Sequence, residues 1–300
     1  MNGPILLFGG NGQVGREFAS LARAGGLALI APRRQDVDIA DAAAVTDAIT
    51  RAAASVVINC AAYTSVDKAE AEPSEAARVN VLGAGNVAVG AAAAAAPLIH
   101  LSTDYVFDGT KVGAYSEDDH IAPLGVYGRT KADGESAVRL ATPRHVILRT
   151  SWVFGVHGRN FLKTMLLLAR QREELRVVAD QHGCPTATAD IARALQAVVG
   201  AIQASSARWG VYHFAGRGAT SWHGFATEIV EQQARFSGKR PPVRAIGTAE
   251  YPTPARRPAN SELDSSLFAG AFGYRAETWQ KRTAEAVATL MSGEAVETGK

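Results

Sequence analysis

Short apolar runs alternate with longer helical stretches through the first half of the chain. The runs predict strands of a sheet that is buried on both faces: Ile5–Phe8, Leu27–Ala31, Ser55–Cys60, Leu98–Ser102 and His145–Thr150. The stretches between them have helical periodicity and few helix breakers: Gln13–Ala24, Asp41–Ala54, Glu72–Ala96 and Val126–Leu140. This alternation predicts βαβ units and a parallel sheet with right-handed crossovers.

Beyond Trp152 the pattern changes to helices separated by irregular segments. Helices are expected at Asn160–Glu174, Ala189–Ala204, Ser221–Ala234 and Trp279–Met291. Strands are expected at Leu175–Val178 and Val211–Ala215, and the proline-rich stretch Tyr251–Pro258 should be extended. The expected fold class is α/β: a Rossmann-type, doubly wound parallel sheet over residues 1–151, which the chain rejoins around 188–218. Residues 152–291 should mainly form a smaller C-terminal α/β domain, and 292–300 a flexible tail.

Composition narrows the class of protein further. The 300 residues are 47% hydrophobic and 20% charged, with a net charge of +2, which is ordinary for a folded soluble protein. The balanced charge predicts no nucleic-acid or membrane partner, and no apolar run has the roughly 20 residues that cross a bilayer. Cys60 and Cys184 lack the spacing of a disulfide framework or zinc site, and the apolar run Pro4–Phe8 lacks the basic region and the cleavage site expected of a secretory signal. We therefore expect a cytoplasmic protein.

Glycines stand between the first predicted strand and the first predicted helix, at positions 9, 12 and 15. They allow a tight turn, a close approach of backbone N–H groups to a pyrophosphate, and close packing of the helix on the sheet. The strand before them and the helix after them supply the context that such a motif requires. The pattern predicts a dinucleotide at this helix N-terminus, in contact with Gly9, Gly12, Gln13 and Val14.

The segment after the second strand bears on the choice of dinucleotide. Pro32-Arg33-Arg34 stands where an NAD site usually has an acidic residue for the ribose 2′-hydroxyl. Two guanidinium groups suit a 2′-phosphate, so the sequence favours NADP(H). NAD(H) stays open because Asp36 and Asp38 follow closely and because both arginines could be solvated surface charges. The further expected cofactor contacts are Asp38 and Ile39 near the adenine, and Ala61, Ala62 and Tyr63 near the cofactor's middle.

Tyr127 and Lys131 are four residues apart, which places both side chains on one face of a helix. An ammonium group beside a phenol should lower the pKa of the phenol, so that Tyr127 exchanges a proton near neutrality. This spacing is common by chance. It gains weight because Thr103 ends the fourth strand at the carboxyl edge of the sheet, where a hydroxyl can polarise a carbonyl. Thr103, Tyr127 and Lys131 are the candidate catalytic residues.

These motifs together resemble the extended short-chain dehydrogenases, and in detail the dTDP-4-dehydrorhamnose reductase family. The superfamily-wide signature is the glycine loop with Leu101–Tyr105, Tyr127–Lys131 and Arg149–Val153. The narrower segments are Asn59–Glu70, Ser102–Gly109, Asp180–Thr186 and Arg257–Asp264. The resemblance runs from about residue 4 to residue 290.

The resemblance implies NADPH-dependent reduction of the C4 keto group of dTDP-4-dehydro-6-deoxy-L-mannose to dTDP-L-rhamnose. In that reading Tyr127 donates the proton, Lys131 holds the nicotinamide ribose and tunes Tyr127, and Thr103 hydrogen-bonds the carbonyl oxygen. The implied substrate contacts are Thr64, Val66, Thr103, Asp104, Trp152 and Arg257, the last of them facing the substrate pyrophosphate.

One departure from the family concerns metal. Some members bind Mg²⁺ through glutamates at a dimer contact. Glu17 matches one such position, but Ala189 stands where another glutamate would be. The sequence therefore predicts no metal site, and a monomer or weak homodimer.

Two other functions stay open. A relative in the superfamily is a non-catalytic regulatory subunit that binds NADP, and other members are nucleotide-sugar epimerases or dehydratases. Intact Thr103, Tyr127 and Lys131 favour an enzyme, because a pure binder does not need all three. Asp104 does not discriminate, because relatives that only reduce also carry it. The remaining conspicuous residues are interpreted as structural: His100 in the core, Trp209, Trp222 and Trp279 packed in the smaller domain, and Glu117–Asp119 in a solvated loop.

Overall fold

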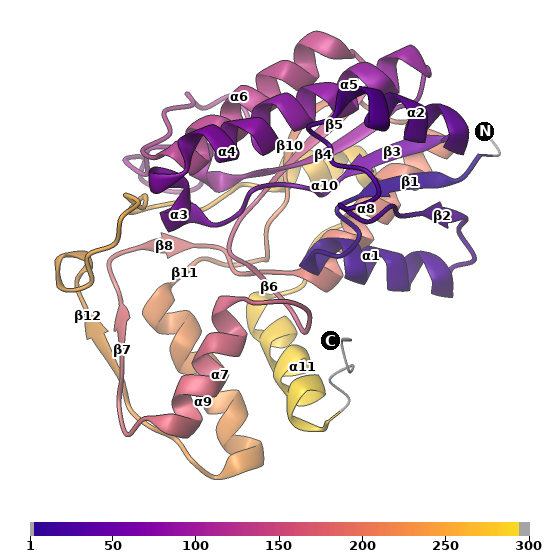
Figure 1. Ribbon diagram of the computed structural model, residues 1–300. Helices are drawn as coiled ribbons and strands as arrows, with labels where there is room; N and C mark the ends of the chain where they lie inside the picture. Colours follow the sequence, from indigo (N-terminus) through magenta and orange to yellow (C-terminus); the bar gives the residue numbers. More distant parts are fainter. Residues whose placement is uncertain (1–2, 294–300) are drawn as a thin grey trace.

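A six-stranded parallel sheet forms the centre of the larger part of the molecule (Figure 1). The computed structural model describes residues 3–293. The strands of the sheet are β1 (Ile5–Phe8), β2 (Leu29–Ile30), β3 (Val56–Asn59), β4 (Leu98–Thr103), β5 (His145–Thr150) and β10 (Gly210–His213). Their order is β2-β1-β3-β4-β5-β10. The order reverses between β1 and β3, and in sheets of this kind a crevice for ligands lies at the carboxyl ends of the strands there.

Helices cover both faces of this sheet (Figure 1). One face carries α1 (Gln13–Ala24), α8 (Thr188–Gln203) and α10 (Ser266–Phe272); the other carries α2 (Ala42–Ala52), α5 (Ala84–Ala93) and α6 (Val126–Ala141). Each layer has its own core of fully buried apolar side chains, around Phe18 and Leu195 on the first face and around Val45 and Val87 on the second. The predicted doubly wound α/β sheet is confirmed.

The rest of the chain forms a smaller part, drawn below the sheet in Figure 1. Its helices are α7 (Phe161–Gln171), α9 (Trp222–Ser237) and α11 (Trp279–Met291), and β7 (Leu175–Val178) pairs in parallel with β12 (Val243–Ile246). Short pairs connect the parts: β6 (Val153–Phe154) with β9 (Thr186–Ala187), and β8 (His182–Gly183) with β11 (Thr220–Ser221). The helices share a core that includes Phe225, Ile229 and Val287. The division of roles between the two parts stays a prediction.

The predicted helix Glu72–Ala96 is interrupted. The structure has α4 (Pro73–Ala77), a π-helical turn η1 (Arg78–Gly83) and then α5. The wide turn directs Asn80 inward, where its side-chain amide accepts a hydrogen bond from the Tyr63 N–H at 2.8 Å and donates to Thr130 Oγ1 at 3.1 Å. These bonds, which join the turn to the loop after β3 and to α6, offset the cost of leaving the regular α-helical pattern.

Several short elements were not predicted. They are α3 (Val66–Ala71), α10, the two-residue strands β6, β8, β9 and β11, the strand β12, and the 3-10 turns η2 (Asp104–Val106) and η3 (Thr248–Glu250). Most of the expected flexible tail 292–300 lies outside the described residues, which end at 293. Within residues 3–293 no helix is both long and apolar enough to span a bilayer.

Candidate active site

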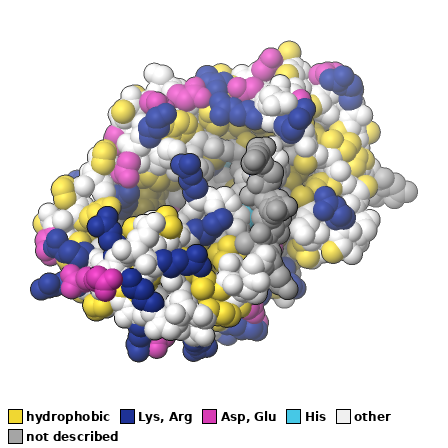
Figure 2. Space-filling model, turned by 60° about the horizontal axis from the view of Figure 1, so that its bottom comes forward, with side chains coloured by type: hydrophobic (Ala, Val, Ile, Leu, Met, Phe, Trp, Pro, Cys, Tyr) yellow, Lys and Arg dark blue, Asp and Glu magenta, His cyan; other side chains and the backbone are white. Residues whose placement is uncertain are grey.

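A cleft with a cavity volume of about 840 Å³ opens beside the carboxyl ends of β1, β3 and β4. Its walls come from the glycine loop, the loop after β2, the start of α6 and, across from them, the smaller part of the molecule. On the face shown in Figure 2, Lys and Arg side chains lie around a hollow. Lys and Arg side chains beside a hollow suit ligands that carry phosphate.

The glycine loop fits a pyrophosphate. Gly9 has φ +81°, and a Cβ there would lie 2.5 Å from the Ala61 nitrogen. At Gly15 a Cβ would lie 2.2 Å from the Gly9 carbonyl oxygen, so α1 packs against the loop as closely as glycine allows. No side chain caps α1, and its first turn holds no acidic residue. The N-terminal N–H groups of α1 are thus left for an anion. The loop is also tied to the smaller part, because Asn160 Nδ2 donates to Gln13 Oε1 at 2.8 Å.

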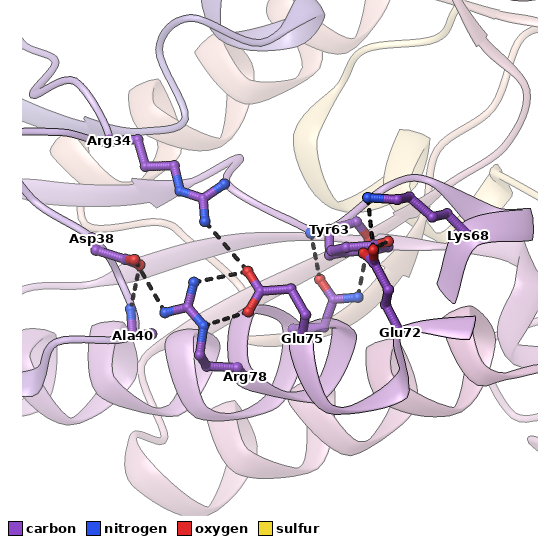
Figure 3. Close-up of polar contacts among 9 residues, drawn as sticks. Arg34, Asp38, Ala40, Tyr63, Lys68, Glu72, Glu75 and Arg78 are labelled. Carbon is purple, nitrogen blue, oxygen red and sulfur yellow. Dashed lines mark hydrogen bonds and ion pairs between the residues drawn. The ribbon is translucent and has the colours of Figure 1, made fainter. Parts of the chain in front are cut away.

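At the other end of the cleft, positive groups are each balanced by a carboxylate (Figure 3). Arg34 lies 3.4 Å from Glu75, and Arg78 bridges Glu75 at 2.6 Å and Asp38 at 3.1 Å. Hydrogen bonds from the Ala40 amide and then from Arg78 lower the pKa of Asp38. Arg33 makes a separate exposed pair with Asp36 at 2.8 Å. Both predicted phosphate-binding arginines therefore line the cleft and are already paired with carboxylates.

The start of α6 is held from two sides. The Glu70 carboxylate of α3 accepts a hydrogen bond from the Val126 N–H at 2.8 Å, which satisfies one of the unpaired donors of the helix. A Cβ at Gly128 would lie 2.1 Å from the Tyr105 carbonyl oxygen, so only glycine lets α6 approach η2 this closely. These contacts fix the position of Tyr127, whose ring packs edge-on against Tyr105 with centroids 5.8 Å apart.

The electrostatics of Tyr127 and Lys131 differ from expectation. Burial raises the pKa of Tyr127 to about 12, and hydrogen bonding to Thr103 opposes the rise only in part. The Lys131 ammonium donates to the Leu101 carbonyl oxygen at 2.7 Å and lies 3.5 Å from His100 Nε2. Burial lowers the pKa of Lys131 to about 8, although Glu135 favours its charged form. The prediction that Lys131 lowers the phenol pKa is therefore wrong for this structure: Tyr127 holds its proton at neutral pH and can act as an acid.

Aromatic side chains line the same cleft as Tyr127 and Lys131, from the side of the smaller part. Trp152 stacks on Trp222 with ring centroids 3.5 Å apart and planes within 5°. Phe161 packs on Trp222, with ring centroids 4.7 Å apart. Trp152 has φ +44°, an uncommon conformation for a bulky residue. Gly183 makes room for it, since a Cβ there would lie 2.6 Å from the indole. Both indoles line the cleft, where an aromatic ring can pack against a sugar or a base.

A buried ion pair lies behind Lys131. Glu135, one turn further along α6, binds Arg149 of β5 through both oxygens, at 2.9 and 2.7 Å, and accepts from Ser102 Oγ at 2.5 Å. Arg149 also donates to His213 Nε2 at 3.3 Å, so His213 is neutral and its Nδ1–H donates to the Tyr115 carbonyl. Consistently, burial and then Arg149 lower the pKa of His213 to about 3. The network joins α6, β4, β5 and β10 behind the site.

Residues 1–292 match the family described as RmlD substrate binding domain. The dTDP-4-dehydrorhamnose reductase of Sinorhizobium fredii is 44% identical over 289 residues, 96% of this chain and 97% of that protein. The chain belongs to the dTDP-4-dehydrorhamnose reductase family. Among solved structures, the family member from Clostridium acetobutylicum has a TM-score of 0.89 and 36% identity, covering 96% of this chain and 99% of that one. The Bacillus anthracis member, solved in complex with NADP, has a TM-score of 0.89 and 32% identity with the same coverage.

Most residues predicted from the family motifs meet in the cleft. Those that line it are Gly9, Gly12, Gln13, Val14, Arg33, Arg34, Asp38, Ile39, Ala61, Ala62, Thr64, Val66, Thr103, Asp104, Tyr127, Lys131 and Trp152. Two others do not. The Tyr63 hydroxyl donates to Glu72 at 2.8 Å (Figure 3), and Arg257 pairs with Asp67 at 2.8 Å. The individual roles of all these family positions remain predictions.

Part of the cleft wall was not predicted from the sequence. Trp222 packs in the smaller part, as predicted, and in addition lines the cleft, where it stacks on Trp152. Phe161 and Arg159 also line it, and no motif marked either of them. Glu117 was expected in a solvated loop but accepts a hydrogen bond from the His213 N–H at 2.7 Å. Contacts between segments this distant leave no local pattern in the sequence.

The position linked to metal in some family members has other partners here. Glu17 accepts a hydrogen bond from Thr188 Oγ1 at 3.3 Å and lies 3.8 Å from His157 Nε2. Among residues 3–293, no group of three or more His, Cys, Asp or Glu side chains is arranged to hold a metal ion.

Proposed function

We propose that this chain is an NADPH-dependent reductase that converts the C4 keto group of dTDP-4-dehydro-6-deoxy-L-mannose into the hydroxyl of dTDP-L-rhamnose. The observation that carries the proposal is the meeting of Thr103, Tyr127 and Lys131 in the same cleft as the glycine loop. Membership of the family supports the substrate, and the NADP complex of the Bacillus anthracis relative supports the cofactor.

The mechanism follows from the chemistry of the side chains. When bound, NADPH supplies the hydride. Tyr127, protonated at neutral pH, gives its proton to the C4 oxygen, and Thr103 offers a hydroxyl to the negative charge that develops there. Lys131 would hold the nicotinamide ribose, and the N-terminus of α1 with Gly9, Gly12 and Gln13 would hold the pyrophosphate. Trp152 and Trp222, which both line the cleft, would pack against the substrate.

A cofactor-oxidation assay with identified product tests this function. We expect NADPH consumption with dTDP-4-dehydro-6-deoxy-L-mannose, and mass and NMR spectra that identify dTDP-L-rhamnose. A panel of 4-keto sugars on other nucleotides would define the base and sugar that the cleft accepts. Binding of NADPH without turnover of any panel member would instead favour the regulatory-subunit function.

Cofactor preference is tested by removing both arginines of the β2 loop. Arg33 and Arg34 each pair with a carboxylate that a 2′-phosphate can replace. Charge-assisted hydrogen bonds contribute about 1.5–3 kcal/mol, so replacing both with Ala should raise the NADPH KM roughly 10- to 100-fold and the NADH KM much less. Arg51→Ala, at an exposed arginine of α2, is the matched control. Equal changes for both cofactors would show that these arginines do not read the phosphate.

We also propose a reducing compartment, the cytoplasm, because Cys60 and Cys184 are both free thiols. The monomer or weak homodimer expected from the sequence stays a prediction, which sedimentation would test.

A further inference from the structure

Four charged side chains at the β2 end of the cleft form one connected set (Figure 3): Arg34, Asp38, Glu75 and Arg78. Arg34 and Asp38 line the cleft, whereas Glu75 of α4 and Arg78 of η1 are not among its lining residues. Both carboxylates carry their charge at neutral pH, because hydrogen bonds lower the pKa of each, first from Arg78 for Glu75 and first from the Ala40 amide for Asp38. The two positive and two negative charges of the set therefore cancel.

Glu75 is bound much more closely to Arg78 than to Arg34. Arg78 Nε donates to Glu75 Oε2 at 2.6 Å and Arg78 Nη2 donates to Glu75 Oε1 at 2.9 Å, the two parallel bonds that make a guanidinium–carboxylate pair strong. Arg34 Nη2 reaches the same Oε1 only at 3.4 Å. Arg78 is itself held by Asp38, whose Oδ2 accepts from Nη1 at 3.1 Å and whose Oδ1 accepts from the Ala40 N–H at 3.0 Å. Glu75 thus has a fixed position, and Arg34, with a side chain 72% exposed, is the member that can move away.

A 2′-phosphate bound at the end of β2 would meet this set through Arg34. The residue at this place in the fold contacts the ribose 2′ position of a dinucleotide. To bind the phosphate, Arg34 must leave Glu75 or be shared with it, and the carboxylate, which Arg78 holds in place, remains nearby as a like charge. A ribose 2′-hydroxyl carries no charge, so NADH avoids both costs. The neighbouring Arg33 pairs with Asp36 at 2.8 Å, outside this set.

We propose that Glu75 is a specificity-determining residue, which acts through Arg34 to limit the preference for NADPH over NADH. The proposal rests on the cofactor named in the proposed function. Arg78 contributes by keeping the Glu75 carboxylate in place. Because the charges at the ribose 2′ site balance, the protein should accept both cofactors, with only a modest preference for NADPH.

Glu75→Gln tests this role. Glutamine keeps the length of the side chain and one oxygen for Arg78, but it removes the charge that holds Arg34 and repels a phosphate. The NADPH KM should fall by about 3- to 10-fold and the NADH KM should change by less than about 2-fold, as expected for the loss of one partly exposed charge. The fall should become smaller as salt is raised to roughly 1 M, because salt screens exposed charges. A role in folding alone would change both KM values alike at any salt.

Arg34→Ala and the double variant complete a mutant cycle. Since Glu75 acts through Arg34, Glu75→Gln should leave the ratio of the NADPH and NADH KM values nearly unchanged when position 34 is already alanine. Glu231→Gln is the matched control and should keep wild-type KM values: Glu231 of α9 also pairs with an arginine, Arg240, at 2.5 Å, and its side chain is 40% exposed against 37% for Glu75. A rise of the NADPH KM in Glu75→Gln, equal changes for both cofactors, or an undiminished effect in the Arg34→Ala background would overturn the proposal.

Titration of the full chain with NADPH and NADH, followed by cofactor fluorescence without substrate, separates this role from the reaction. We expect the ratio of the two Kd values to shift toward NADPH in Glu75→Gln by the same factor as the KM ratio. A wild type that binds both cofactors but reduces no nucleotide sugar would refute the proposed reaction, and the shift in Kd would still support the role of Glu75. A wild type that reduces the substrate, with an unshifted Kd ratio in the variant, would refute the role of Glu75 alone.

Discussion

Replacing Tyr127 by Phe should lower kcat by about 10²- to 10⁴-fold, the range typical of a lost general acid. Phenylalanine keeps the ring that packs edge-on against Tyr105 at 5.8 Å and removes only the hydroxyl. Because Tyr127 is protonated at neutral pH in this structure, the lost group is the proton donor itself. NADPH affinity, which depends on the glycine loop and the β2 loop, should change little.

The measurement is the rate of NADPH oxidation with saturating substrate, together with NADPH binding followed by fluorescence. Tyr212→Phe is a matched control, because that hydroxyl lies outside the cleft and donates to the Arg208 carbonyl at 3.0 Å. It should retain wild-type kcat. Full activity in Tyr127→Phe would show that another group protonates the substrate and would refute the proposed mechanism.

The main sheet could be predicted because its signal is local. Strands buried on both faces are continuous apolar runs, and β1, β3, β4 and β5 are found within a residue or two of the predicted ranges. The predicted strand Leu27–Ala31 is shorter, at Leu29–Ile30, because β2 is an edge strand that pairs only with β1. The π-helical turn around Asn80 was missed because its partners Tyr63 and Thr130 are distant in the sequence.

The reaction centre could be placed for a similar reason. Thr103 ends β4, and Tyr127 and Lys131 lie in the first two turns of α6; in a parallel sheet such positions converge at one edge. Sequence patterns could not predict the wall of the cleft that the smaller part forms, nor the pKa values of the buried groups. Trp222 faces the cleft only because the smaller part folds over it, and the pKa of Tyr127 is set by burial, which the spacing of Tyr127 and Lys131 does not reveal.

Glu135→Gln should lower the free energy of unfolding by about 3–5 kcal/mol, the usual cost of breaking a buried ion pair from one side. Glu135 is fully buried, and both of its oxygens bind Arg149, which is 2% exposed. Glutamine keeps the shape but turns one acceptor into an N–H donor facing the guanidinium. Arg149 would then hold a buried charge without a counterion, and its remaining partner, His213, is neutral.

Urea denaturation of the two proteins measures this difference through the midpoint and slope. Asp47→Asn is the matched control, because Asp47 pairs with Arg51 on the exposed surface of α2, where such pairs contribute about 0–1 kcal/mol. A loss in Glu135→Gln no larger than in the control would mean that Arg149 finds solvent or another partner.

The same variant should lower the pKa of Lys131 further, because Glu135 favours its charged form. At a pH where the variant remains folded, its NADPH KM should therefore rise, since a neutral Lys131 binds the ribose less well than an ammonium group.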